Sequence, residues 1–198
     1  MKKFSLLFKR KQEPISDSAR LRQLGVETKD DSVVMVGSPI IECKNGGRIV
    51  LGRNVSLISD IQYNPAGINH PVFLIADGPD ARIVIGDNSG ISGTSIVTSS
   101  TIEIGNNVMI GANCNLFGTD FHCHSADKRR VQKSMQEAPS APIIIEDDCW
   151  LGANVTVLKG VTIGQETIIG TMSLVNKSIP SHCLAAGVPA KVIRSLEQ

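Results

Sequence analysis

The sequence has few aromatic residues, and it lacks both a long apolar run and an excess of charge. Phenylalanine, tryptophan and tyrosine together make up 4% of the 198 residues. The apolar stretch near the N-terminus, FSLLF, is too short for a membrane span or for the apolar region of a signal peptide. The net charge is +1, so the chain lacks the excess of basic residues that general nucleic-acid binders show. We therefore expect one domain with an aliphatic core, no membrane span and no nucleic-acid partner.

The N-terminal segment MKKFSLLFKRKQ places cations on both sides of its apolar residues. This composition is typical of a frayed basic arm. A weak peripheral contact with a membrane is the alternative, because apolar and cationic side chains together favour the lipid–water interface.

The five cysteines are odd in number, scattered and never spaced as CxxC. This distribution favours a reducing, cytoplasmic location and gives no disulfide framework and no zinc motif. Cys114 and Cys149 fall within the repeats described next, where a small buried hydrophobic side chain is expected.

A six-residue period begins at Ile145 and continues through six blocks, IEDDCW, LGANVT, VLKGVT, IGQETI, IGTMSL and VNKSIP. Short repeats bury a core only by stacking, and three hexapeptides complete one triangular coil. The period therefore predicts a parallel β-helix, although a β-sandwich would also show regular turn signals. We call the first, aliphatic residue of each block its head. The heads of the six blocks are Ile145, Leu151, Val157, Ile163, Ile169 and Val175, and earlier heads are Ile85, Ile91, Ile104 and Ile110, with Leu51 as a candidate for the first one.

Three segments depart from the period. Residues 14–24 predict a short helix, with Ser16 or Asp17 as N-cap, that packs on an open end of the solenoid. Residues 33–80 predict irregular coils with a surface loop, and residues 118–141 predict a functional loop that interrupts the coils. The predicted division is an N-terminal arm and helix (1–32), a β-helix (33–186) and a C-terminal tail (187–198).

The motifs DCWLGANVTVLKGVTIG, AAGVPAKVIR and TDFH together resemble those of the hexapeptide-repeat acyltransferases. The chain is most similar to galactoside and maltose O-acetyltransferases and to enzymes that acetylate capsule or lipopolysaccharide sugars. The resemblance implies an all-β, left-handed parallel β-helix that forms a homotrimer. It also implies acetyl-CoA in a groove between neighbouring subunits, a small-molecule or glycan acceptor, and no metal.

Acetyl transfer to a hydroxyl needs a base, and imidazole titrates near neutral pH. His122 matches the catalytic histidine of the family, and its spacing to Arg129 fits as well. Asp120 is a candidate to orient His122, with a main-chain carbonyl as the alternative. By resemblance, the backbone N–H of Ala153 would stabilise the oxyanion.

The resemblance also assigns the substrate contacts. Ser92 stands where the galactoside enzymes hold the acceptor hydroxyl with asparagine, and His124 is a further candidate. Asn69 and His70 are loop residues that could reach the acceptor. The tail cations suit the CoA phosphates. The residues that match cofactor contacts are Trp150, Ala153, Thr171, Asn176, Lys177, Lys191 and Arg194.

Other functions remain as alternatives. An N-acetyltransferase acting on an amino sugar would use nearly the same site. A zinc enzyme similar to the γ-carbonic anhydrases would need His122 and His124 as ligands, but their spacing differs from that family's. A solenoid without catalysis could serve as an assembly platform. Cys123 would be the nucleophile of a covalent route, which the family does not use.

Overall fold

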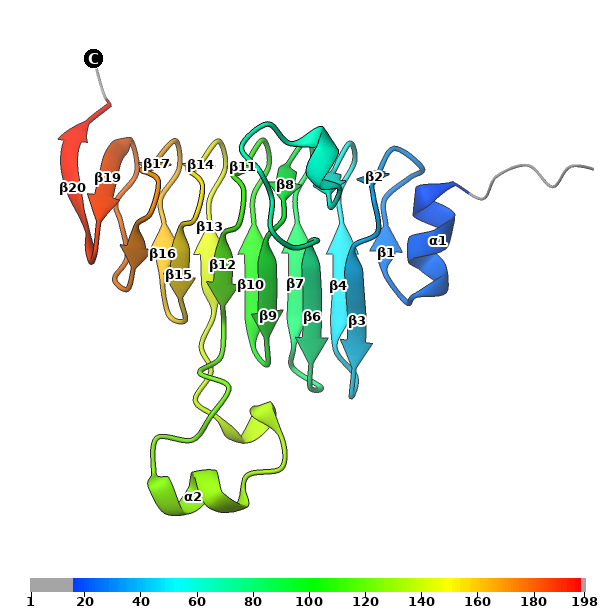
Figure 1. Ribbon diagram of the computed structural model, residues 1–198, viewed down its shortest axis with the longest axis vertical. Coiled ribbons are helices and arrows are strands. Elements are labelled where there is room, and N and C mark those ends of the chain that lie inside the picture. The colour runs from blue at the N-terminus through cyan, green and yellow to red at the C-terminus, as the bar shows by residue number, and fades with distance from the viewer. Residues whose placement is uncertain (1–15, 197–198) are drawn as a thin grey trace, which may run out of the picture.

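The computed structural model describes residues 16–196, so the predicted basic arm at residues 1–15 lies outside the described part. The chain winds through three sheets in turn, and every neighbouring pair of strands is parallel except the last (Figure 1). Sheet A contains β1 Glu27–Thr28, β4 Arg48–Leu51, β7 Arg82–Ile85, β10 Thr101–Ile104, β13 Ile143–Ile145 and β16 Thr162–Ile163.

Sheets B and C complete the prism. Sheet B contains β2 Val34–Val36, β5 Ser56–Ile58, β8 Gly90–Ser92, β11 Met109–Ile110, β14 Trp150–Leu151, β17 Ile168–Ile169, β19 Cys183–Gly187 and β20 Ala190–Ser195. Sheet C contains β3 Ile40–Lys44, β6 Phe73–Asp77, β9 Ser95–Thr98, β12 Asn115–Phe117, β15 Thr156–Leu158 and β18 Leu174–Val175.

The heads of the hexapeptides form the core, as the period predicts. All six from residue 145 onward are at most 1% exposed, and the earlier heads are at most 3% exposed. Burying each such aliphatic side chain stabilises the fold by about 1.5–3 kcal/mol. Cys114 and Cys149 are fully buried among them, and burial raises the pKa of each thiol to about 11. The predicted parallel β-helix is confirmed.

The predicted N-terminal helix is α1 Asp17–Gln23, and it covers one end of the solenoid (Figure 1). Ser16 is the N-cap, since its side chain accepts a hydrogen bond from the N–H of Ala19. Leu21 is fully buried in the core of the β-helix. The other helical segments in the described part of the chain are η1 Ile61–Tyr63, α2 Ala126–Val131 and η2 Met135–Glu137.

Residues 33–80 form coils of the β-helix with a surface loop at 59–72, as predicted, but the strands of these coils are more regular than expected. Strands β2 to β6 lie in this region and pair in register with the later coils. Extra residues at the corners change the sequence period without disturbing the strands, because only the inward positions must be aliphatic. Sheet A also begins before residue 33, because β1, at Glu27–Thr28, pairs with β4.

The corner between sheets A and B holds a column of polar side chains in left-handed backbone conformation. Asn54, Asn88, Asn107 and Asp148 have φ between 54° and 60°. Each amide of the three asparagines donates to the next side chain along the column, over 3.0–3.3 Å. Asparagine tolerates this conformation better than most residues, which explains its place at the corner.

We expect Asn107→Ala to destabilise the fold more than Asn107→Gly. Both variants lose the hydrogen bonds to Asn88 and Asp148, but only alanine carries a Cβ at the φ of 56°. The difference in free energy of unfolding should be about 1 kcal/mol, measured by urea denaturation. Equal values for the two variants would show that backbone strain at this corner is negligible.

Two other edges of the prism position the functional residues. The B–C edge joins sheet B to sheet C through residues 37–39, 59–72, 93–94, 111–114, 152–155 and 170–173. The C–A edge joins sheet C to sheet A through residues 45–47, 78–81, 99–100, 118–142, 159–161 and 176–178.

Candidate functional site

The predicted functional loop at residues 118–141 projects from the C–A edge and carries α2 (Figure 1). Its two ends pair with each other: Thr119 bridges Ser140, and the N–H of Asp120 donates to the carbonyl of Pro139 over 3.0 Å. The loop is therefore closed at its base, and the coils continue on either side of it.

Two side chains of the loop hold the backbone on both sides of His122. Gln132 Nε2 donates to the carbonyl of Phe121 over 2.7 Å, and its Oε1 accepts from the N–H of Cys123 over 2.8 Å. Arg129 Nη1 donates to the carbonyl of Cys123 over 2.9 Å. Sequence reasoning noted the spacing of Arg129 but missed Gln132, because loop contacts of this kind leave no periodic signal.

A tight γ-turn presents His122. Its N–H donates to the carbonyl of Asp120 over 2.7 Å, and the central residue, Phe121, has a φ of 62°. A positive φ is strained for a bulky side chain, and such strain is concentrated at functional sites. The ring of Phe121 packs edge-on against Phe117 with centroids 5.1 Å apart, which secures the turn. The His122 side chain is exposed beside a cavity of about 340 Å³.

The carboxylate of Asp120 makes no hydrogen bond to the imidazole of His122 within residues 16–196, so the orienting role of this side chain stays a prediction. Its Oδ2 lies 2.6 Å from Nε2 of His124, and its Oδ1 lies 2.7 Å from Nζ of Lys159. Burial raises the pKa of Asp120, but the hydrogen bonds from Lys159 and His124 outweigh it, so the pKa lies below its usual range. The carboxylate therefore ties the loop to the solenoid. Sequence reasoning missed Lys159.

Lys159→Met should raise the pKa of Asp120 and lower stability at neutral pH by roughly 1 kcal/mol. A carboxyl with a depressed folded pKa contributes stability above its unfolded pKa of about 4, and the contribution disappears as pH falls through the folded value. The variant should therefore approach wild type below that pH. Carboxyl NMR titration and unfolding at several pH values check both points, and a constant stability difference down to the lowest pH would contradict them.

Ala153 lies on the B–C edge, and its N–H donates to no acceptor within residues 16–196. A Cβ added at Gly111, one coil earlier, would lie 2.9 Å from this nitrogen, so the glycine keeps the N–H accessible. Thr171 is exposed on the same edge, one coil later. Trp150 is 48% exposed on sheet B and pairs with Met109, which is 58% exposed.

The tail cations lie on one face of a β-hairpin. Lys191 pairs with Ala186 and Arg194 pairs with Leu184, with a shift in register between these two pairs. Leu184 and Ala186 are two residues apart and share a face of β19, so their partners share it as well. Without the bulge, residues three apart on a strand would point to opposite faces.

The predicted site residues do not meet within one chain. His122 lies on the C–A edge with Asn176 and Lys177, whereas Ala153 and Thr171 lie on the B–C edge. Ser92 ends β8 at the B–C edge, where it pairs with Ile58.

No group of three His, Cys, Asp or Glu side chains within residues 16–196 is placed to hold a metal ion. None of the helices in the described part of the chain has the length and hydropathy that a membrane crossing requires.

Two repeat families match the chain. "Bacterial transferase hexapeptide (six repeats)" matches residues 142–177, and "Hexapeptide repeat of succinyl-transferase" matches residues 101–120. These two parts of the chain therefore carry hexapeptide repeats, which are typical of the left-handed β-helix. The predicted fold class is confirmed.

The relatives are acetyltransferases, as the resemblance predicts. Galactoside O-acetyltransferase of Escherichia coli (strain K12) is 39% identical over 102 residues, which are 52% of this chain and 48% of that protein. The chain spans about half the length of the curated relatives it matches.

Solved structures extend the likeness to most of the chain. The polySia-specific acetyltransferase NeuO is 26% identical, with 86% of this chain and 70% of that chain covered and a TM-score of 0.53. A galactoside acetyltransferase in complex with coenzyme A is 24% identical, with 94% and 74% covered and a TM-score of 0.58, which shows the fold.

Proposed function

We propose that the protein is a cytoplasmic O-acetyltransferase that moves an acetyl group from acetyl-CoA to a hydroxyl of a sugar or surface glycan. The observation that carries the proposal is the strained γ-turn that presents His122, since its φ of 62° at Phe121 is costly and is held by Gln132 and the Phe117 ring. The galactoside relative gives the substrate class. Five free cysteines suit a reducing compartment.

The residues of the B–C edge and the C-terminal hairpin fit acetyl-CoA. Lys191 and Arg194 on one face suit its phosphates, and the exposed Thr171 and the half-exposed Trp150 would line the path of its pantetheine arm. Asn176 and Lys177 would contact it from the C–A edge of a neighbouring copy. Acetyl-CoA supplies the acetyl group as an activated thioester.

A homotrimer would complete the site. The B–C and C–A edges flank sheet C, so copies that meet through this sheet would bring His122 of one subunit toward Ala153 of the next. The outer face of sheet C carries a row of apolar side chains that are register partners. The outward positions of sheet A, in contrast, include charged residues. The row consists of Ile75, Val97, Phe117 and Leu158.

The chemistry needs three groups of the chain. His122 takes the proton of the acceptor hydroxyl as the oxygen attacks the thioester carbonyl, and later gives it to the leaving sulfur. The Ala153 N–H donates to the carbonyl oxygen as negative charge develops there. Ser92 would hold the acceptor hydroxyl. Two substrates and the base then react in one complex, with no covalent enzyme intermediate.

The test is release of CoA thiol from acetyl-CoA across a panel of sugars and amino sugars, with product mass determined. Acceptor-dependent release of an ester product that hydroxylamine cleaves would support the proposal. An amide product would identify the N-acetyltransferase instead. Absence of both acetyl-CoA binding and thiol release would contradict an acyltransferase. Sedimentation equilibrium tests the trimer separately.

A further inference from the structure

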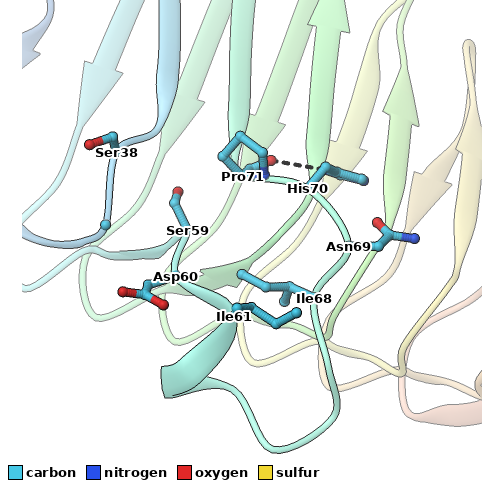
Figure 2. A pocket seen from close by; sticks show the side chains of 9 residues that line it. Ser38, Ser59, Asp60, Ile61, Ile68, Asn69, His70 and Pro71 are labelled. Carbon is cyan, nitrogen blue, oxygen red and sulfur yellow. Dashed lines mark hydrogen bonds between the residues drawn. The ribbon is translucent and has the colours of Figure 1, made fainter.

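The loop at residues 59–72 forms a second cavity, of about 490 Å³, on the B–C edge. Gly37 and Ser38 line it from the coil before, and residues 59–61 and 68–71 line it from the loop. In Figure 2, Ile61 and Ile68 lie in the middle of the cavity lining, Ser59 and Pro71 lie above them, and Asp60 and Ser38 lie on the side opposite Asn69 and His70. This volume is in the ordinary range for small-molecule sites.

The loop is held in place by contacts along the edge. Asn113, from the coil of β11, accepts from the N–H of Asn69 over 2.8 Å and donates to the carbonyl of Gly67 over 3.0 Å. Ser59 Oγ accepts from the N–H of Val72 over 3.0 Å, which joins the two ends of the loop. A cavity framed in this way is preformed rather than opened by a ligand.

The lining, as far as the described residues form it, combines apolar surface with hydrogen-bonding groups and contains no lysine or arginine. Asp60 Oδ1 caps η1 by accepting from the N–H of Gln62, and Oδ2 has no partner among residues 16–196. Nδ1 of His70 lies 2.8 Å from the carbonyl oxygen of Pro71, which can only accept, so Nδ1 donates this hydrogen bond and Nε2 is the ring nitrogen left for a ligand. Ile61 is 64% exposed and offers an apolar surface.

These groups match an uncharged pyranose, whose hydroxyls donate to carboxylate and imidazole and whose C–H face packs on isoleucine. They do not match a uronic acid, a sialic acid or a phosphate, since Asp60 would repel the anion and no lysine or arginine among residues 16–196 lines the cavity.

The position of the cavity gives its relation to the reacting group. The loop leaves the coil of β5, and β8 and β11 lie between β5 and β14. Adjacent strands are about 4.8 Å apart, so the start of the loop lies roughly 14 Å along the edge from Ala153. That separation exceeds one sugar ring and suits a glycan chain laid along the edge.

We infer that this cavity is a distal glycan subsite, which binds an uncharged pyranose residue of the acceptor chain while another residue of the same chain is acetylated near Ala153. The inference rests on the proposed function for the reaction at Ala153, but binding in the cavity can be measured without it. It makes an oligosaccharide, rather than a free monosaccharide, the preferred acceptor.

The binding test uses saturation-transfer NMR with neutral gluco-, galacto- and manno-oligosaccharides of two to four residues, their methyl monosaccharides, and matched uronate oligosaccharides. Asp60→Asn keeps the Oδ1 cap and removes the charge, and Asp80→Asn removes an exposed carboxylate on the C–A edge as control. A neutral oligosaccharide should bind wild type and Asp80→Asn equally and Asp60→Asn about tenfold more weakly. Ile61→Arg, at an exposed position, should shift preference toward the uronates.

Kinetics separate the subsite from the reaction. In acetyl transfer, Asp60→Asn should raise the KM for the oligosaccharide about tenfold and leave kcat and the KM values for methyl monosaccharide and acetyl-CoA unchanged. If oligosaccharide binding depends on Asp60 but no acetyl transfer occurs, the proposed function is contradicted and the subsite is supported. Equal binding by wild type and Asp60→Asn, tighter binding of uronates to wild type, or no binding of any neutral oligosaccharide would overturn the subsite.

Discussion

His122→Ala should lower acceptor-dependent acetyl transfer by about 10²–10⁴-fold, the usual contribution of a positioned general base. Acetyl-CoA binding should persist, because the cations of the hairpin and the B–C edge are untouched. The measurement is steady-state thiol release beside calorimetric binding of acetyl-CoA. The loss should appear in kcat, since proton removal occurs in the transition state.

A matched control separates the base from the general effect of losing an imidazole. His182→Ala removes a histidine at the corner between sheets A and B, outside the site. Its Nδ1 lies 3.4 Å from Oε2 of Glu166. It should retain the wild-type rate within about twofold. A His122→Ala variant as active as this control would show that another group is the base.

Ala153→Pro should reduce kcat by about 10²–10³-fold, because it removes the N–H that would meet the developing oxyanion. Ala153→Ser keeps that N–H and should retain most of the activity. The contrast follows from the donor being a main-chain group, so the side chain matters little. Thiol release under saturating acetyl-CoA measures both variants.

Proline can also disturb a turn, and the preceding coil supplies the control. Ala112 occupies the same turn position one coil earlier, since Ile110 and Leu151 are register partners. Its N–H likewise donates to no acceptor in the described residues. Ala112→Pro should therefore cost a comparable amount of stability without the same fall in kcat. Equal losses of kcat would assign the effect to the backbone of the edge rather than to one donor.

The six-residue period was sufficient to predict the solenoid, because every head must be aliphatic to fill a narrow interior. It is degenerate over residues 33–80, where the same inward pattern is present but corners of varying length hide it. Burial imposes the periodic pattern on the inward positions of the strands, whereas the corners are not buried and can vary in length. The strands of β2 to β6 could be recognised only once their register partners were known.

The site was less accessible to sequence reasoning than the fold. His122 and Ala153 were named from motifs, but their separation onto two edges depends on how many residues each corner contains. The partners of Asp120 illustrate the same limit: Lys159 is close because the coil returns to the C–A edge, far along the sequence. His124, two residues from His122, takes the carboxylate because the γ-turn directs the two side chains differently.

The antiparallel hairpin of β19 and β20 has a consequence for assembly. In sheet B, each strand before β19 pairs with the parallel strand of the next coil. A solenoid that ended in such a strand would leave its edge unpaired, and the first coil of another molecule could pair with it end to end. β20 reverses the chain direction and carries a bulge at its contact with β19. An incoming parallel coil would meet a strand of opposite polarity with cationic side chains on its outer face. The hairpin therefore ends the stack and opposes growth of filaments from this end of the solenoid.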